Sequence, residues 1–208
     1  GAFVALGGWG LVRYGLDTKQ ADRYDRKADR TRAAFNAQFW NPAASCLFDG
    51  LGNGGPDPSI RPNQLFAVSL PFPVLDEARR AAVVRVVEEK LLTPLRLRTL
   101  DPSPPQYDGR IEGGPWQPDH AYHQGTVWPW LLGPFVTAYI RSAPDTDTAR
   151  TRMRQLLDNV GRHLTEAGIG SVCEVADGDP PHRPGGCYFQ AWSVAEPLRA
   201  LCEDVLGR

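Results

Sequence analysis

Apolar residues recur every three or four positions over much of the chain, which is the spacing of one face of an α-helix. In the segment 18–40, Tyr24, Phe35 and Phe39 fall on one side and charged residues on the other, which predicts an amphipathic helix. The segment from about 76 to 92 repeats this pattern, with acidic residues near its start. Similar patterns predict a short buried helix that begins at Pro62, an apolar helix near the start of the chain, and helices at 126–141, 145–167 and 190–206.

Two long segments between these helices, 93–120 and 168–188, are rich in proline, glycine and aspartate. No segment alternates apolar and polar residues as a half-buried strand would, so we expect an all-α domain. Irregular loops of this length in a compact domain are usually functional. Because long loops alternate with short connections, we expect helical hairpins in a single domain, residues 1–208, with function gathered at one end.

The bulk composition fits a folded globular domain, since 42% of the 208 residues are hydrophobic and 23% are charged. A net charge of -1 gives no field that would attract nucleic acid or an anionic membrane. No apolar run approaches the ~20 residues that cross a bilayer. We therefore expect neither nucleic acid nor membrane as a partner.

The four cysteines, Cys46, Cys173, Cys187 and Cys202, form no CxxC pair. Cys173, His182 and Cys187 are conceivable zinc ligands, but their spacing matches no common zinc pattern. We therefore expect no metal and no cofactor. Free thiols persist in a reducing compartment, which favours a cytoplasmic protein.

The stretch AYHQGTVWPW combines two tryptophans, Trp128 and Trp130, with tyrosine, histidine and glutamine side chains. Sugars are recognised by flat apolar faces together with dense hydrogen bonding, because a buried polar group left unpaired is costly. Alternatively, the tryptophans form part of a helix core, and Tyr122 and His123 make structural hydrogen bonds. A similar choice, between capping a turn and lining a polar pocket, applies to Arg61, Asn63 and Gln64.

The second long loop contributes three carboxylates, Glu174, Asp177 and Asp179. Glycoside hydrolysis commonly needs two carboxyl groups, one as acid and one as base or nucleophile. The loop is therefore a candidate source of catalytic groups, although most exposed acids serve only for solvation.

Several motifs together resemble one family. RPNQ, TPLRLRTL, YHQGTVWPW and QAWSVAE occur in the order found in the C-terminal catalytic region of glycogen debranching enzymes of the amylo-α-1,6-glucosidase type. The resemblance covers most of residues 30–205. It implies an (α/α)6 toroid of the six-hairpin glycosidase type, of which this chain holds the C-terminal half.

The resemblance also implies an activity, the hydrolysis of α-1,6-linked glucose at glycogen branch points with inversion, in glycogen catabolism. By the same resemblance, Glu174 corresponds to the general base. The general acid of the family lies in the first half of the toroid, in a segment that precedes anything matched here. Asp108 and Glu112, the acids nearest the YDGR turn, do not replace it.

The implied partners are glycogen or another branched α-glucan and the missing N-terminal half of the toroid. Two other functions stay open: a truncated, noncatalytic glucan-binding remnant without the general acid, and a related hydrolase of another α-glucoside. We expect Trp130 and Trp192 within helices and His120 and His182 on loop surfaces. The residues that line the glucose pocket, or else anchor its loops, are Asn63, Gln64, Arg98, Arg110, Tyr122, His123, Gln124, Trp128 and Gln190.

Overall fold

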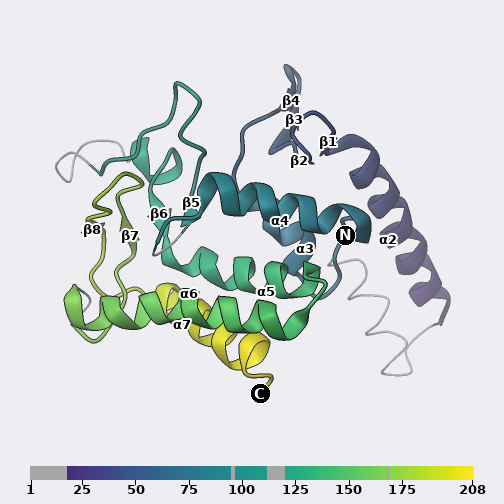
Figure 1. Ribbon diagram of the computed structural model, residues 1–208. Helices are drawn as coiled ribbons and strands as arrows, with labels where there is room; N and C mark the ends of the chain where they lie inside the picture. Colours follow the sequence, from purple (N-terminus) through teal and green to yellow (C-terminus); the bar gives the residue numbers. More distant parts are fainter. Residues whose placement is uncertain (1–17, 95–96, 112–119, 168) are drawn as a thin grey trace.

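The computed structural model describes residues 18–94, 97–111, 120–167 and 169–208, and helices dominate these ranges (Figure 1). No helix within them combines the length and the apolar run that a bilayer crossing needs. The α-helices are α2 (Thr18–Gln38), α3 (Phe66–Ser69), α4 (Glu77–Leu91), α5 (Leu132–Ser142), α6 (Thr146–Glu166) and α7 (Ala191–Arg199). Shorter turns are η1 (Pro62–Leu65), η2 (His120–His123), η3 (Pro129–Leu131) and the π-helical η4 (Ala200–Val205).

Helix α5 is the centre of the packing, because α3, α4, α6 and α7 all contact it. Its sequence, LGPFVTAYIRS, is apolar on nearly every side, as expected of a helix surrounded by others. Phe135, Val136 and Ala138 are completely buried. In Figure 1, α4 and α6 flank α5 on opposite sides, and α2 stands apart at the edge of the molecule.

Helix α7 approaches α5 closely at Gly133. A Cβ atom there would lie 2.9 Å from Cβ and 3.1 Å from the carbonyl oxygen of Glu196, so a larger residue would push the helices apart. A charged network closes the same contact: the Arg199 guanidinium pairs with Glu196 and Asp204, each at 3.1 Å. Thr137 on α5 donates to Asp204 at 2.6 Å, which ties the last two elements to the central helix.

Most predicted helices are found, with one clear error. The helix expected at 126–141 begins only at Leu132, because Val127 and Trp128 form a strand and Pro129 opens a 3-10 turn. The helix expected at 190–206 is α7 followed by the π-helical η4. The apolar helix predicted near the start falls within residues 1–17, outside the described ranges.

The fold is predominantly helical, as expected of an all-α domain, but the short strands in the described ranges were not predicted. Two hairpins, β1 (Trp40–Asn41) with β2 (Cys46–Leu47) and β3 (Gly50–Gly52) with β4 (Gly55–Asp57), follow α2. A four-stranded antiparallel sheet has the order β5 (Leu97–Arg98), β6 (Val127–Trp128), β7 (Val175–Ala176) and β8 (Pro184–Gly185). Strands of two residues are too short to produce an alternating pattern.

Side-chain hydrogen bonds hold the loops around this sheet in place. The Tyr107 hydroxyl donates to Asp179 Oδ1 at 2.8 Å, and Arg98 Nε donates to the Gly178 carbonyl at 2.9 Å. The backbone N–H of Ile111 donates to Asp177 Oδ1 at 2.9 Å. Burial, followed by the hydrogen bond to Asp179, raises the pKa of Tyr107 to about 12. These contacts hold the loop before η2 against the loop between β7 and β8.

Replacing Tyr107 by Phe removes the donor to Asp179 and should lower the free energy of unfolding by about 1 kcal/mol near neutral pH. Because the pKa of Tyr107 in the folded protein lies above its unfolded value of about 10, the contribution is complete below that pH and is lost as the pH rises towards 12. Urea unfolding should show the wild-type and Tyr107→Phe stabilities converging above about pH 10. The exposed Tyr188→Phe is the control, and a gap between wild type and Tyr107→Phe that does not change with pH would contradict the assignment.

Candidate active site

The four-stranded sheet brings the family-like motifs together at one end of the helices (Figure 1). Strand β6, from YHQGTVWPW, lies between β5, from TPLRLRTL, and β7, from the CEVADGD loop. Leu97 faces Trp128 in the register, and Val127 pairs with both Arg98 and Ala176. Segments that are about 30 and 50 residues apart in sequence thus become neighbours through backbone hydrogen bonds.

Glu174 lies immediately before β7 and is half-buried. Its Oε2 accepts hydrogen bonds from the Cys187 backbone N–H at 3.0 Å and from the Tyr122 hydroxyl at 3.2 Å. The Glu174 N–H in turn donates to the Cys187 carbonyl at 2.8 Å. Within the described part of the chain no donor reaches Oε1, so one oxygen is fixed and the other can accept a proton.

Because Gly186 has no side chain, it leaves room for the Glu174 carboxylate. Its φ is +66°, a conformation that favours glycine, and a Cβ atom there would lie 2.6 Å from Glu174 Oε2 and 3.0 Å from the Tyr122 hydroxyl. Any larger residue at this position would strain the backbone and displace the carboxylate. The glycine pair in RPGGCY therefore has a local structural reason.

An aromatic cluster lies beside Glu174. The Tyr122 ring meets Trp128 edge-on at 5.4 Å, and Trp128 Nε1 donates to the Tyr122 carbonyl at 2.9 Å. The His123 ring stacks on Trp128 at 6.0 Å with an interplanar angle of 6°. Trp192, at the start of α7, packs edge-on against Trp128 and stacks on Trp130.

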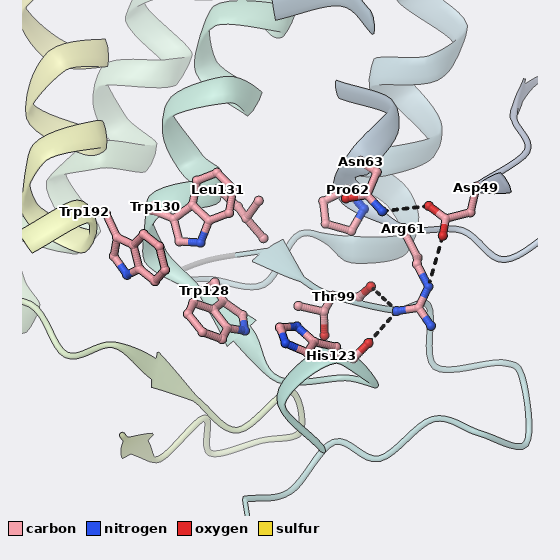
Figure 2. Close-up of a pocket in the computed structure, with 10 residues that line it drawn as sticks. All are labelled: Asp49, Arg61, Pro62, Asn63, Thr99, His123, Trp128, Trp130, Leu131 and Trp192. Atoms are coloured by element: carbon pink, nitrogen blue, oxygen red, sulfur yellow. Dashed lines mark hydrogen bonds and ion pairs between the residues drawn. The ribbon is translucent and has the colours of Figure 1, made fainter. Parts of the chain in front are cut away.

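The rings of His123, Trp128, Trp130 and Trp192 line a pocket of about 430 Å³, a size typical of small-molecule sites (Figure 2). Trp128 and His123 lie on one side of it, and Trp130 and Leu131 on the other. The residues that line it are Asp49, Arg61, Pro62, Asn63, Thr99, His123, Trp128, Trp130, Leu131 and Trp192. A wide indole surface facing polar side chains suits a sugar ring.

Arg61 organises the polar wall. Its guanidinium donates to the Thr99 carbonyl at 3.1 Å, to the His123 carbonyl and to Gln124 Oε1 at 2.7 Å. It also pairs with Asp49 at 3.5 Å. One side chain thus joins the β2–β3 turn, the residue after β5 and the pair of residues at the end of η2.

The predicted pocket residues divide into two groups. Tyr122, His123, Trp128 and Asn63 lie at the aromatic cluster or in the pocket lining. Gln64 is buried and bonded to Leu47 and Arg61, and Gln124 is held by Arg61, so both anchor backbone segments. Arg98 bonds to a backbone carbonyl, Arg110 is exposed, and Gln190 precedes α7 with its N–H bonded to Val172.

Sequence reasoning missed part of the lining. Asp49 and Thr99 were not singled out, because one lies between two hairpins that were not predicted and the other directly follows β5 of the missed sheet. Trp130 and Trp192 were expected within helices, yet both line the pocket, and Trp192 is 46% exposed. The position of Trp192 just after a long loop was the available signal.

The other acids near the sheet have structural partners. Asp177 accepts from Ile111, Asp179 from Tyr107, and Asp108 from Arg110 while pairing with His120 at 3.7 Å. Glu112 lies outside the described residues. In the described ranges no three His, Cys, Asp or Glu side chains gather as metal ligands.

Comparison with known proteins agrees with the motifs. The family model for amylo-alpha-1,6-glucosidase matches residues 10–199. Over 89 residues the chain is 32% identical to the glycogen debranching enzyme of Saccharomyces cerevisiae, a match that covers 40% of this chain and 6% of that protein.

The fold resembles that of GH63 mannosylglycerate hydrolase from Thermus thermophilus, solved with Tris and D-glycerate. The TM-score is 0.60 at 16% identity, over 95% of this chain and 41% of that one. The chain therefore spans less than half the length of either protein. The family resemblance read from the motifs is confirmed, and the chain belongs to the amylo-alpha-1,6-glucosidase family of glycoside hydrolases.

Proposed function

We propose that this chain is the base-bearing half of an enzyme that hydrolyses α-1,6-linked glucose at glycogen branch points with inversion. The observation that carries the proposal is the setting of Glu174, with Oε2 fixed by two donors and Oε1 open. A carboxylate held in this way can orient a water molecule beside a sugar stacked on the neighbouring indoles. The family match supports the substrate class.

In the proposed reaction, Glu174 Oε1 takes a proton from a water molecule whose oxygen bonds to C1 of the terminal glucose. The bond between C1 and the glycosidic oxygen breaks, and a general acid gives that oxygen a proton. The products are β-glucose and a linear glucan. In an inverting glycosidase the two carboxyl groups lie ~6.5–9.5 Å apart, which leaves room for the water.

The general acid is proposed to come from the N-terminal half of an (α/α)6 toroid. Asp108, Asp177 and Asp179, the acids considered near the site, are engaged with protein partners. The chain matches 41% of a single-chain structure of similar fold, which is in keeping with a partial domain. Free cysteines at all four positions favour a cytoplasmic enzyme acting on glycogen.

A second candidate is a glucan-binding remnant without turnover. This candidate is favoured because the other described acids near the site are bonded to protein groups and none of them is left as a general acid. Binding needs only the aromatic and polar walls of the pocket. The two candidates differ in whether the chain ever operates with a general acid.

Replacing Glu174 by Gln in the enzyme with both halves should lower kcat on limit dextrin at least about a hundredfold, because the base is lost while the hydrogen bonds to Oε2 can persist. Dextrin affinity should stay within about twofold, since glutamine keeps the shape of the side chain. Glucose release and equilibrium binding check the two quantities. The matched control is Glu166→Gln at the exposed end of α6, and turnover retained by Glu174→Gln would remove this residue from its role.

The isolated 208-residue chain should release no glucose from limit dextrin above the rate without enzyme, because one carboxyl group cannot supply both acid and base. Dextrin should still quench the fluorescence of the tryptophans in the pocket. Glucose release by the isolated chain would show that the acid is among these residues. Absence of both binding and release would oppose the remnant interpretation too.

A further inference from the structure

Asp49 contributes a carboxylate to the pocket that the family motifs do not include. It lies between the two hairpins that follow α2, and its side chain is only 18% exposed. Oδ1 accepts from Asn63 Nδ2 at 2.8 Å, and Oδ2 lies 3.5 Å from Arg61 Nε. An ionised carboxylate can accept about four hydrogen bonds, so its remaining lone pairs can receive the hydroxyl groups of a ligand.

Arg61 is largely committed to the protein. Its guanidinium donates to the carbonyl oxygens of Thr99 and His123 and to Gln124 Oε1, and it pairs with the Asp49 carboxylate. Among the described residues that line the pocket Arg61 is the only arginine or lysine. The positive charge of this lining arginine is therefore already paired with Asp49.

The charges of the wall thus cancel before any ligand arrives. A neutral ligand with several hydroxyl groups would meet acceptors on Asp49 and Asn63 and an apolar platform on Trp128 and Trp192. A ligand carrying a carboxylate or phosphate near this wall would have to compete with Asp49 for the Arg61 charge and would lie close to the Asp49 carboxylate. Like charges brought together in a partly desolvated site repel strongly.

We propose that Asp49 is a specificity-determining residue, which makes this pocket accept uncharged glycosyl groups and reject anionic ones. The inference rests on the proposed function for its ligand class, sugars, and adds the selection by charge.

The test uses two probes that share a ring, methyl α-glucoside and methyl α-glucuronide, which differ by a carboxylate at C6. Calorimetric titration of the 208-residue chain should give an affinity for the glucoside at least about tenfold above that for the glucuronide. Asp49→Asn leaves the Arg61 charge unbalanced, so it should weaken glucoside binding about tenfold through loss of a charged acceptor and bring the ratio of the glucoside affinity to the glucuronide affinity to one or below. Asp147→Asn, whose side chain is 95% exposed on α6, removes the same charge far from the pocket and should leave the ratio unchanged.

A measurement on the wild-type chain covers the case in which Asp49→Asn does not fold. Raising the salt concentration should narrow the gap between the two probes, because a charge repulsion is screened and a steric effect is not. A wild-type ratio near one, or a ratio independent of salt, would overturn the proposal. So would an Asp49→Asn chain, folded by circular dichroism, that discriminates as wild type does.

Failure of this inference is separable from failure of the proposed function. Selection by charge is measured as binding of the two probes to the 208-residue chain, and the proposed reaction is measured as glucose release by the complete enzyme. Loss of discrimination with branch-point hydrolysis intact would overturn the role of Asp49 alone. Intact discrimination without hydrolysis in the complete enzyme would overturn the proposed reaction and leave the role of Asp49 standing.

Discussion

The backbone pairing of β6 with its two neighbours is the constraint on which the site depends. Only two residues belong to each of β5, β6 and β7, yet their hydrogen bonds fix three loops relative to one another. Val127 has pairs on both sides, with Arg98 and with Ala176. Because Trp128 follows it directly and Glu174 comes just before β7, this small sheet sets the spacing of the indole platform and the carboxylate.

A second set of contacts comes from side chains whose hydrogen bonds are made within the protein and not to a ligand. Arg61 is the main example, because it connects the turn at Asp49, the residue after β5 at Thr99 and the turn at His123. Gln64 acts similarly, Gln124 accepts a hydrogen bond from the Arg61 guanidinium, and Tyr107 joins the two long loops through Asp179. A polar pocket assembled from loops needs such anchors, since loop backbone groups would otherwise be left unpaired when buried.

The helices and the family could be predicted from the sequence, since apolar periodicity over 15 to 21 residues is a strong signal in α2, α4 and α6. The small sheet could not, because strands of two residues carry no period and owe their existence to partners far along the chain. The different roles of Asn63 and Gln64 within the RPNQ motif could not be predicted from the sequence either. Whether Gln64 faces the core and Asn63 the pocket depends on the rotation of a single 3-10 turn.

The contacts that orient Glu174 all lie within this chain. Tyr122, Cys187 and the space above Gly186 hold its carboxylate without help from any other segment. As the proposed base, Glu174 would need no reorganisation when a sugar arrives, which is the condition under which fixed polar groups contribute most to catalysis. In the proposed complete toroid, the other half would have two tasks, to supply an acid and to cover apolar surface.

Such a surface lies on α7. Val194 and Leu198 are 39% and 55% exposed and lie four residues apart on one side of the helix, whereas Glu196 on another side packs against Gly133 of α5. Fully burying a large aliphatic side chain stabilises by about 1.5–3 kcal/mol, so covering these two residues would offset part of the entropy lost when the two proposed halves associate. Trp192 points to a different side of α7 and belongs to the pocket wall. The surface proposed for assembly and the ring proposed for sugar binding are therefore separate parts of the same helix.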